Sequence, residues 1–71
     1  MRHGSEIIRA WREAEGLTQE EAAALAPCSQ EHWSDLERAK KMPGVALAVR
    51  LSELTRGSKH HCRVESWAVT R

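Results

Sequence analysis

The chain of 71 residues contains no Phe and no Tyr, so its three aromatic side chains are all Trp. Gly and Pro are also few, and frequent Ala favours helices over sheets. No long apolar run is present, so we expect neither a signal peptide nor a membrane-spanning segment. A chain this short buries a modest core, which leaves little room for a catalytic cleft. We therefore expect one domain, residues 1–71, and no enzyme.

Cysteine and positive charge are also limited. The two cysteines are Cys28 and Cys62, and without a secretory signal we expect reduced thiols in a cytoplasmic protein. The formal net charge is +1, far from the strongly basic balance of an obvious nucleic-acid binder. All eleven Lys and Arg lie outside residues 18–37, and that window holds five carboxylates. Any binding of a polyanion must therefore draw its attraction from the flanks of this window.

Two predicted helices lie at either side of this acidic window. The first has Ser5 as its N-cap and stops at Gly16, a residue that takes a positive φ without strain. The other covers residues 45–55, where Leu recurs at helical spacing, and stops at Gly57. The remaining tail, residues 58–71, is either a short helical turn that brings Trp67 onto the core or a strand that pairs two copies of the chain.

The window itself predicts two short helices joined by a tight turn. Thr18 and Glu21 form a T-x-x-E capping box, in which each side chain satisfies a free backbone N–H of the other residue. This helix ends near Ala26, because Pro27 disfavours helical geometry in the residue before it. The next helix restarts at Ser29, a favourable N-cap. A gap of about three residues fits two helices set at roughly 90–120°.

This arrangement resembles the helix-turn-helix of the phage repressor and Cro family, also called the XRE family. The residues that carry the resemblance are Leu17, Thr18, Gln19, Glu21, Ala23, Ser29, Trp33, Leu36 and Glu37. The resemblance implies an all-α, lambda-repressor-like domain of four helices, with a core at residues 5–57 and a C-terminal tail at 58–71. One departure is Pro27, which stands where the family usually has Gly, so the turn must be built differently.

An internal ion pair is expected between the first and third helices. Glu37 follows Trp33 by four residues and falls on the inner side of its helix, so its carboxylate needs a partner. Arg12 is the candidate partner. The family resemblance implies the same pairing, because a buried Arg–Glu pair ties these two helices together in family members.

The resemblance also implies a sequence-specific regulator of transcription that binds double-stranded DNA, a repressor or Cro-like protein of a phage, prophage or bacterium. Residues 29–38 are then the recognition helix in the major groove. The outer-face carboxylates of Glu31 and Asp35 can each accept a hydrogen bond from cytosine N4, while cations on the flanks attract phosphate. The candidate DNA-binding residues are Gln19, Ser29, Gln30, Glu31, Ser34, Asp35, Arg38, Lys40 and Lys41.

We expect an operator DNA and a second copy of the chain as partners, with the C-terminal tail as the candidate dimer contact. We expect no membrane, small-molecule ligand, cofactor or metal, because the His and Cys residues at 60–62 fit no standard spacing of zinc ligands. The alternative function is that of a protein-interaction module, in which the acidic recognition helix docks on a basic partner surface. Steep weakening of binding with salt favours DNA.

Overall fold

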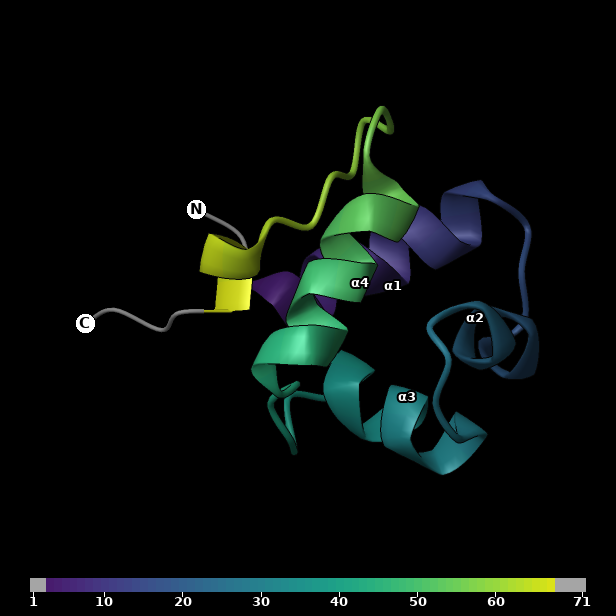
Figure 1. Cartoon of the computed structure of the whole chain (residues 1–71). Helices are drawn as coiled ribbons and strands as arrows, with labels where there is room; N and C mark the ends of the chain where they lie inside the picture. The colour runs from purple at the N-terminus through teal and green to yellow at the C-terminus, as the bar shows by residue number, and fades with distance from the viewer. Residues whose placement is uncertain (1–2, 68–71) are drawn as a thin grey trace.

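The computed structural model describes residues 3–67, which form helices and no strand (Figure 1). The elements are α1 (Gly4–Ala14), α2 (Gln19–Leu25), α3 (Gln30–Glu37), α4 (Val45–Thr55) and a 3-10 turn, η1 (Val64–Trp67). α4 lies across α1, and the α2–α3 pair forms the other side of the molecule. The predicted all-α class with four α-helices is confirmed. None of the helices in the described part of the chain is long and apolar enough to cross a membrane.

The predicted start of α1 is wrong by two residues. His3, rather than Ser5, is the N-cap, and its Nδ1 accepts a hydrogen bond from the Ser5 amide at 3.1 Å. The His3 carbonyl accepts hydrogen bonds from the amides of Glu6 and Ile7, so Ser5 already lies within the first turn of the helix. The predicted stop at Gly16 is confirmed, because Gly16 has a φ of +71° immediately after the last turn of α1.

The predicted caps of α2 and α3 are confirmed. Thr18 and Glu21 make both hydrogen bonds of the capping box, and the Ser29 hydroxyl accepts from the His32 amide at 3.0 Å. In the turn between the helices the peptide bond before Pro27 is cis, and the Cys28 amide donates to the carbonyl of Ala23 at 2.8 Å. No residue of this turn has a positive φ, so the turn differs from one built on a left-handed Gly, as the position of Pro27 predicts.

The core lies where α1, α3 and α4 meet. Ile8, Trp33, Leu36 and Leu51 are completely buried there. The rings of Trp11 and Trp33 pack at a centroid distance of 6.4 Å. By contrast, α2 and the turn after it contribute small side chains, namely the buried Ala22, Ala23 and Ala26. Small residues let α2 approach α3 closely, so α3 is held firmly from its inner side.

The end of α3 has a feature that the sequence did not indicate. Ala39 has a φ of +60°, a left-handed conformation that costs energy for any residue with a Cβ. The Ala39 amide donates to the Leu36 carbonyl at 3.2 Å, and the Lys40 amide donates to the Asp35 carbonyl at 2.9 Å. These two hydrogen bonds end the helix. The basic loop that follows turns back across the last turn of α3.

Of the two alternatives for the C-terminal tail, a helical turn or a strand, the structure has the helical turn. Trp67 in η1 is 4% exposed; its ring lies edge-on to the His3 ring and against Gly4 at the start of α1. The Cys62 amide donates to the Thr55 hydroxyl at 2.8 Å, which fastens the tail to the end of α4. Trp67 therefore closes the core of its own chain, whereas residues 68–71 of the predicted dimer contact lie outside the described residues.

Candidate nucleic-acid interface

A buried carboxylate holds α3 in place relative to α1 and α2. The Glu37 side chain is 4% exposed, and its Oε2 lies 2.6 Å from Arg12 Nε. Arg12 Nη2 donates to the other oxygen at 3.2 Å, so the guanidinium binds the carboxylate in a bidentate manner. Gln19 Nε2 also donates to Oε1, at 3.0 Å, and Trp33 Nε1 donates to Oε2, at 2.5 Å. Donors from three helices thus converge on one side chain.

These contacts shift the ionisation of both charged groups. Burial by itself would raise the pKa of Glu37, but hydrogen bonds from Arg12, Gln19 and Trp33 outweigh it and lower the pKa below its ordinary value. The hydrogen bond that Arg12 donates to Glu37 raises the pKa of Arg12, although burial opposes that shift. Both groups are therefore charged at neutral pH, and a fully satisfied charged network sits under the helix-turn-helix.

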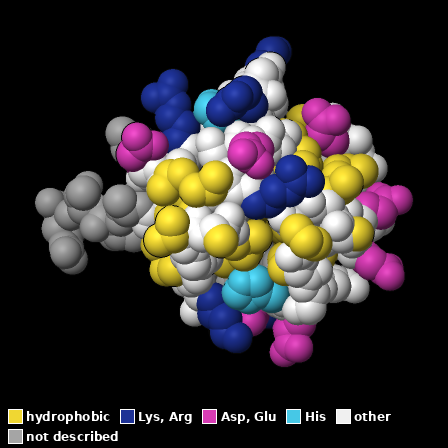
Figure 2. Space-filling model, in the orientation of Figure 1, with side chains coloured by type: hydrophobic (Ala, Val, Ile, Leu, Met, Phe, Trp, Pro, Cys, Tyr) yellow, Lys and Arg dark blue, Asp and Glu magenta, His cyan; other side chains and the backbone are white. Residues whose placement is uncertain are grey.

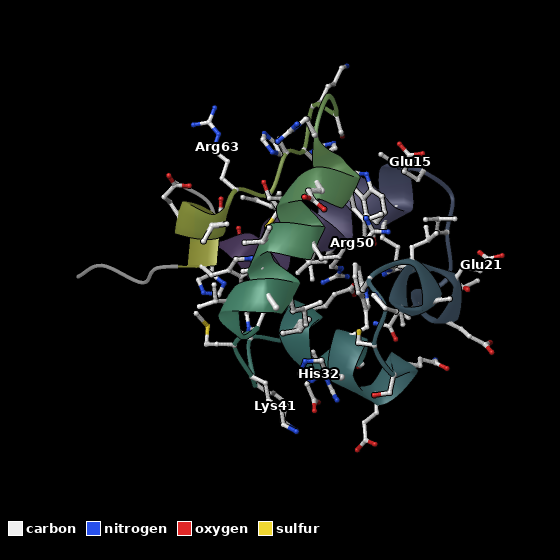
Figure 3. All side chains as sticks on the ribbon, in the orientation of Figure 1. Glu15, Glu21, His32, Lys41, Arg50 and Arg63 are labelled. Carbon is white, nitrogen blue, oxygen red and sulfur yellow. The ribbon has the colours of Figure 1, made fainter. Side chains whose placement is uncertain are left out.

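The outward side of α3 is polar and accessible. Gln30 and Glu31 are exposed in its first turn, next to the exposed cap Ser29, and Ser34 is half-buried one turn further on. Lys41 approaches from the loop after α3, and a shallow cleft of about 380 Å³ separates it from the first turn of the helix. Figure 3 shows His32 and Lys41 side by side at this edge of the molecule.

Asp35 does not lie where its sequence position suggested. We expected it on the exposed face beside Glu31, but its side chain is 13% exposed. Its Oδ1 lies 3.4 Å from Arg38 Nη2 and its Oδ2 lies 3.8 Å from Lys41 Nζ. The expectation fails because the loop after α3 folds back and brings Lys41 over the last turn. A carboxylate held in this way is poorly placed to accept a hydrogen bond from a base.

Two further candidates keep accessible positive charge. Arg38 and Lys41 have side chains that are 61% and 62% exposed although each faces Asp35. Lys40 between them is exposed. Gln19 is half-buried, with one N–H of its amide used by Glu37. Because an amide nitrogen carries two N–H groups, the second remains for another acceptor.

The two cysteines do not form a disulfide with each other. Cys28 and Cys62 are both free. Burial raises the pKa of both thiols, that of Cys62 to about 11, so both are protonated at neutral pH. Within residues 3–67, no group of three or more His, Cys, Asp or Glu side chains is placed to hold a metal ion.

Comparison with protein families agrees with this geometry. A family model described as a helix-turn-helix domain matches residues 6–61, more than half of the chain. The chain belongs to the helix-turn-helix domain family. No curated protein and no solved structure matches it. The match indicates a DNA-binding protein in general terms, and α3 is the second helix of the helix-turn-helix motif.

Sequence reasoning missed two of the residues that support the helix-turn-helix. Trp33 and Gln19 both donate to Glu37, whereas the sequence indicates only Arg12 as its partner and Gln19 only as a DNA-binding candidate. The i, i+4 spacing of Trp33 and Glu37 was a usable signal, because such residues are neighbours on a helix. No comparable signal existed for Gln19, which reaches Glu37 only through the packing of α2 on α3.

Proposed function

We propose that this helix-turn-helix domain is a sequence-specific regulator of transcription that binds a double-stranded DNA operator, with a repressor or Cro-like role and a kinship to the XRE family. It acts by binding and not as an enzyme. The observation that carries the proposal is an exposed polar face on α3, braced from beneath by the Glu37 network. A reading helix must be held rigidly, since base contacts depend on positions fixed to a fraction of an ångström.

The exposed side chains of α3 suit the major groove. Gln30 can form a bidentate pair with adenine N6 and N7, and Glu31 can accept from cytosine N4. Ser34 can pair with either kind of base edge. Each good pair contributes about 1–3 kcal/mol of discrimination against a wrong base. The outward side of α3 therefore offers both hydrogen-bond donors and acceptors to base edges, although it belongs to the acidic window.

Phosphate contacts are proposed for the cations that follow α3 and for the start of α2. Lys40 is exposed, and Arg38 and Lys41 are more than half exposed. Gln19 keeps an N–H for a phosphate while Glu37 fixes its orientation. Contacts of this type set the position of the protein on the duplex, whereas contacts to base edges set the sequence preference.

A homodimer is proposed because one domain of this size covers only a short half-site, and two-fold pairing doubles the contact. The C-terminal Trp67 is buried in its own chain and is not available for this contact. Support comes from exposed apolar side chains. Val45 and Val49 of α4 are 80% and 42% exposed, and Leu25 of α2, whose carbonyl accepts a hydrogen bond from Arg50 of α4, is 44% exposed. Figure 2 shows hydrophobic side chains gathered over this face. Apolar patches of this kind mark interaction sites.

A protein-interaction module is the rival function. The observation that favours it is the exposed negative charge of Glu20, Glu21 and Glu31; acidic side chains also stand out on the α2 side of the molecule in Figure 2. Such a surface repels phosphate and attracts a basic partner. The two functions differ in their response to salt and in whether any duplex is selected.

Selection of bound duplexes from a random DNA pool tests the proposal, followed by a salt series on the selected duplex. We expect one enriched motif and an affinity that falls steeply with salt. Lys40→Ala should weaken binding to every duplex and reduce the salt slope by about 1. Lys59→Ala, an exposed lysine in the loop after α4, is the matched control and should change neither. Absence of any enriched duplex would favour the protein-interaction module.

A further inference from the structure

Asp35 has an unusual position for a carboxylate in a DNA-reading helix. Its two oxygens face two different cations, Arg38 directly after the helix and Lys41 on the loop. These are the ion pairs that Asp35 forms in the described part of the chain. The carboxylate is nearly buried, at 13% exposure, whereas both cations are more than half exposed. The carboxylate is thus fixed, and the cations are free to turn away from it.

Both cations follow α3 in the sequence, with Lys40 as a third cation between them. A carboxylate oxygen and a phosphate oxygen are both anionic acceptors for the same guanidinium and ammonium groups. When a duplex approaches, Arg38 and Lys41 must give up Asp35 before each can neutralise a phosphate fully. Lys40, for which no ion pair with a described residue is found, carries no such cost.

We propose that Asp35 is an internal competitor for phosphate, a positioning residue that restrains Arg38 and Lys41 and thereby sets the overall affinity for DNA without reading a base. This inference rests on the proposed function. It replaces the expectation that Asp35 recognises cytosine, and it makes the opposite prediction for sequence preference. A base reader loses preference at one base pair when it is changed, whereas a competitor changes affinity for all duplexes alike.

The test is a double-mutant cycle on duplex binding, measured by anisotropy on the selected duplex and on a random duplex. Asp35→Asn should bind both duplexes about tenfold more tightly, since the two ion pairs that restrain Arg38 and Lys41 are released together. The ratio of the two affinities should stay unchanged. In a background that carries Arg38→Gln and Lys41→Gln, the gain from Asp35→Asn should largely disappear, because no restrained cation remains.

Glu20→Gln is the matched control, because it removes one negative charge from the helix-turn-helix at an exposed position on α2, and no base or phosphate contact is proposed for Glu20. It reports the gain from reduced repulsion alone and should be smaller than that of Asp35→Asn and equal in both backgrounds. An Asp35→Asn gain that equals the control, or that persists without Arg38 and Lys41, overturns the inference. A changed base preference overturns it as well, and assigns Asp35 to base reading.

A second comparison does not depend on the folding of the Asp35 variant. Lys40→Gln should weaken duplex binding more than Lys41→Gln, since only Lys41 must first leave Asp35. Equal losses, or a larger loss for Lys41, contradict the inference. If neither the wild type nor Asp35→Asn binds any duplex, the proposed function fails and the inference fails with it. If the wild type binds a duplex but Asp35→Asn gains nothing beyond the control, the inference alone fails.

Discussion

Replacement of Arg12 by Ala is the strongest test of the hydrogen-bond network that holds α3. The Arg12 side chain is 15% exposed and that of Glu37 is 4% exposed, so the substitution leaves a carboxylate buried without its charge partner. Removal of one partner from a buried pair costs about 3–5 kcal/mol. A chain of 71 residues has on the order of 4–10 kcal/mol of stability in total. The variant should therefore be marginally folded.

The assay is thermal unfolding followed by far-ultraviolet circular dichroism. Since about 1 kcal/mol shifts the midpoint of a domain this size by about 4–8 °C, Arg12→Ala should lower the midpoint by on the order of 15–30 °C. Arg9→Ala is the matched control on the same helix. Arg9 pairs with Glu13 at 3.4 Å with both side chains more than half exposed, and its loss should cost at most about 0.5 kcal/mol.

A double variant separates the charge from the packing. Glu37→Gln removes the unpaired charge yet keeps an oxygen that can accept from Trp33 Nε1. In the Arg12→Ala background it should therefore raise the midpoint, although in the wild type it should lower it. If Arg12→Ala melts within a few degrees of Arg9→Ala, the network does not hold α3 in place and the reasoning is refuted.

Three further results are expected from the same melting assay. Contacts in the folded state lower the pKa of Glu37 below its ordinary value of 4.5. The stabilisation by the ionised carboxylate is therefore present above pH 4.5 and is lost as the pH falls below that value. The wild type should accordingly lose more stability than Glu37→Gln between about pH 5 and pH 3. A Cβ at Gly4 would lie 2.5–2.8 Å from the Trp67 ring, so Gly4→Ala should lower the stability of the fold by about 1–3 kcal/mol. Gly44→Ala is the control and should lower it less, because nothing lies within 4 Å of a Cβ at Gly44. Ala39→Gly should stabilise the fold by about 0.5–1 kcal/mol, because Gly relieves the strain at a φ of +60°. The first expectation is contradicted if the wild type and Glu37→Gln lose the same stability in acid. The second is contradicted if the two glycine variants lose the same stability, and the third if Ala39→Gly melts at a lower temperature than the wild type.

The features that could be predicted from the sequence are those that local chemistry decides. The capping box of Thr18 and Glu21 and the Ser29 cap need only residues three apart, and both form as expected. Helical spacing also predicts Glu37, four residues after Trp33, on the inner side of α3, where its side chain is 4% exposed. In these cases the relevant partners lie within one helical turn, so the pattern contains the whole interaction.

The features that could not be predicted depend on how a loop folds. Helical spacing placed Asp35 on the outer face because it does not include the loop that carries Lys41 back over α3. The His3 cap was missed because the imidazole is not a usual capping group, although its Nδ1 can accept a hydrogen bond. The tail remained open between a turn and a strand, and the packing of Trp67 against Gly4 decided it.

Nuclear magnetic resonance of the ¹⁵N-labelled protein, titrated with its selected duplex, tests the central claim most directly. If the outward side of α3 reads DNA, the largest amide shifts should occur at Gln30, Glu31 and Ser34, with smaller shifts at Lys40 and at the start of α2. The face of α4 that carries Val49 should change little on a half-site duplex. Shifts confined to α4, or none on α3 at saturating duplex, would contradict the account.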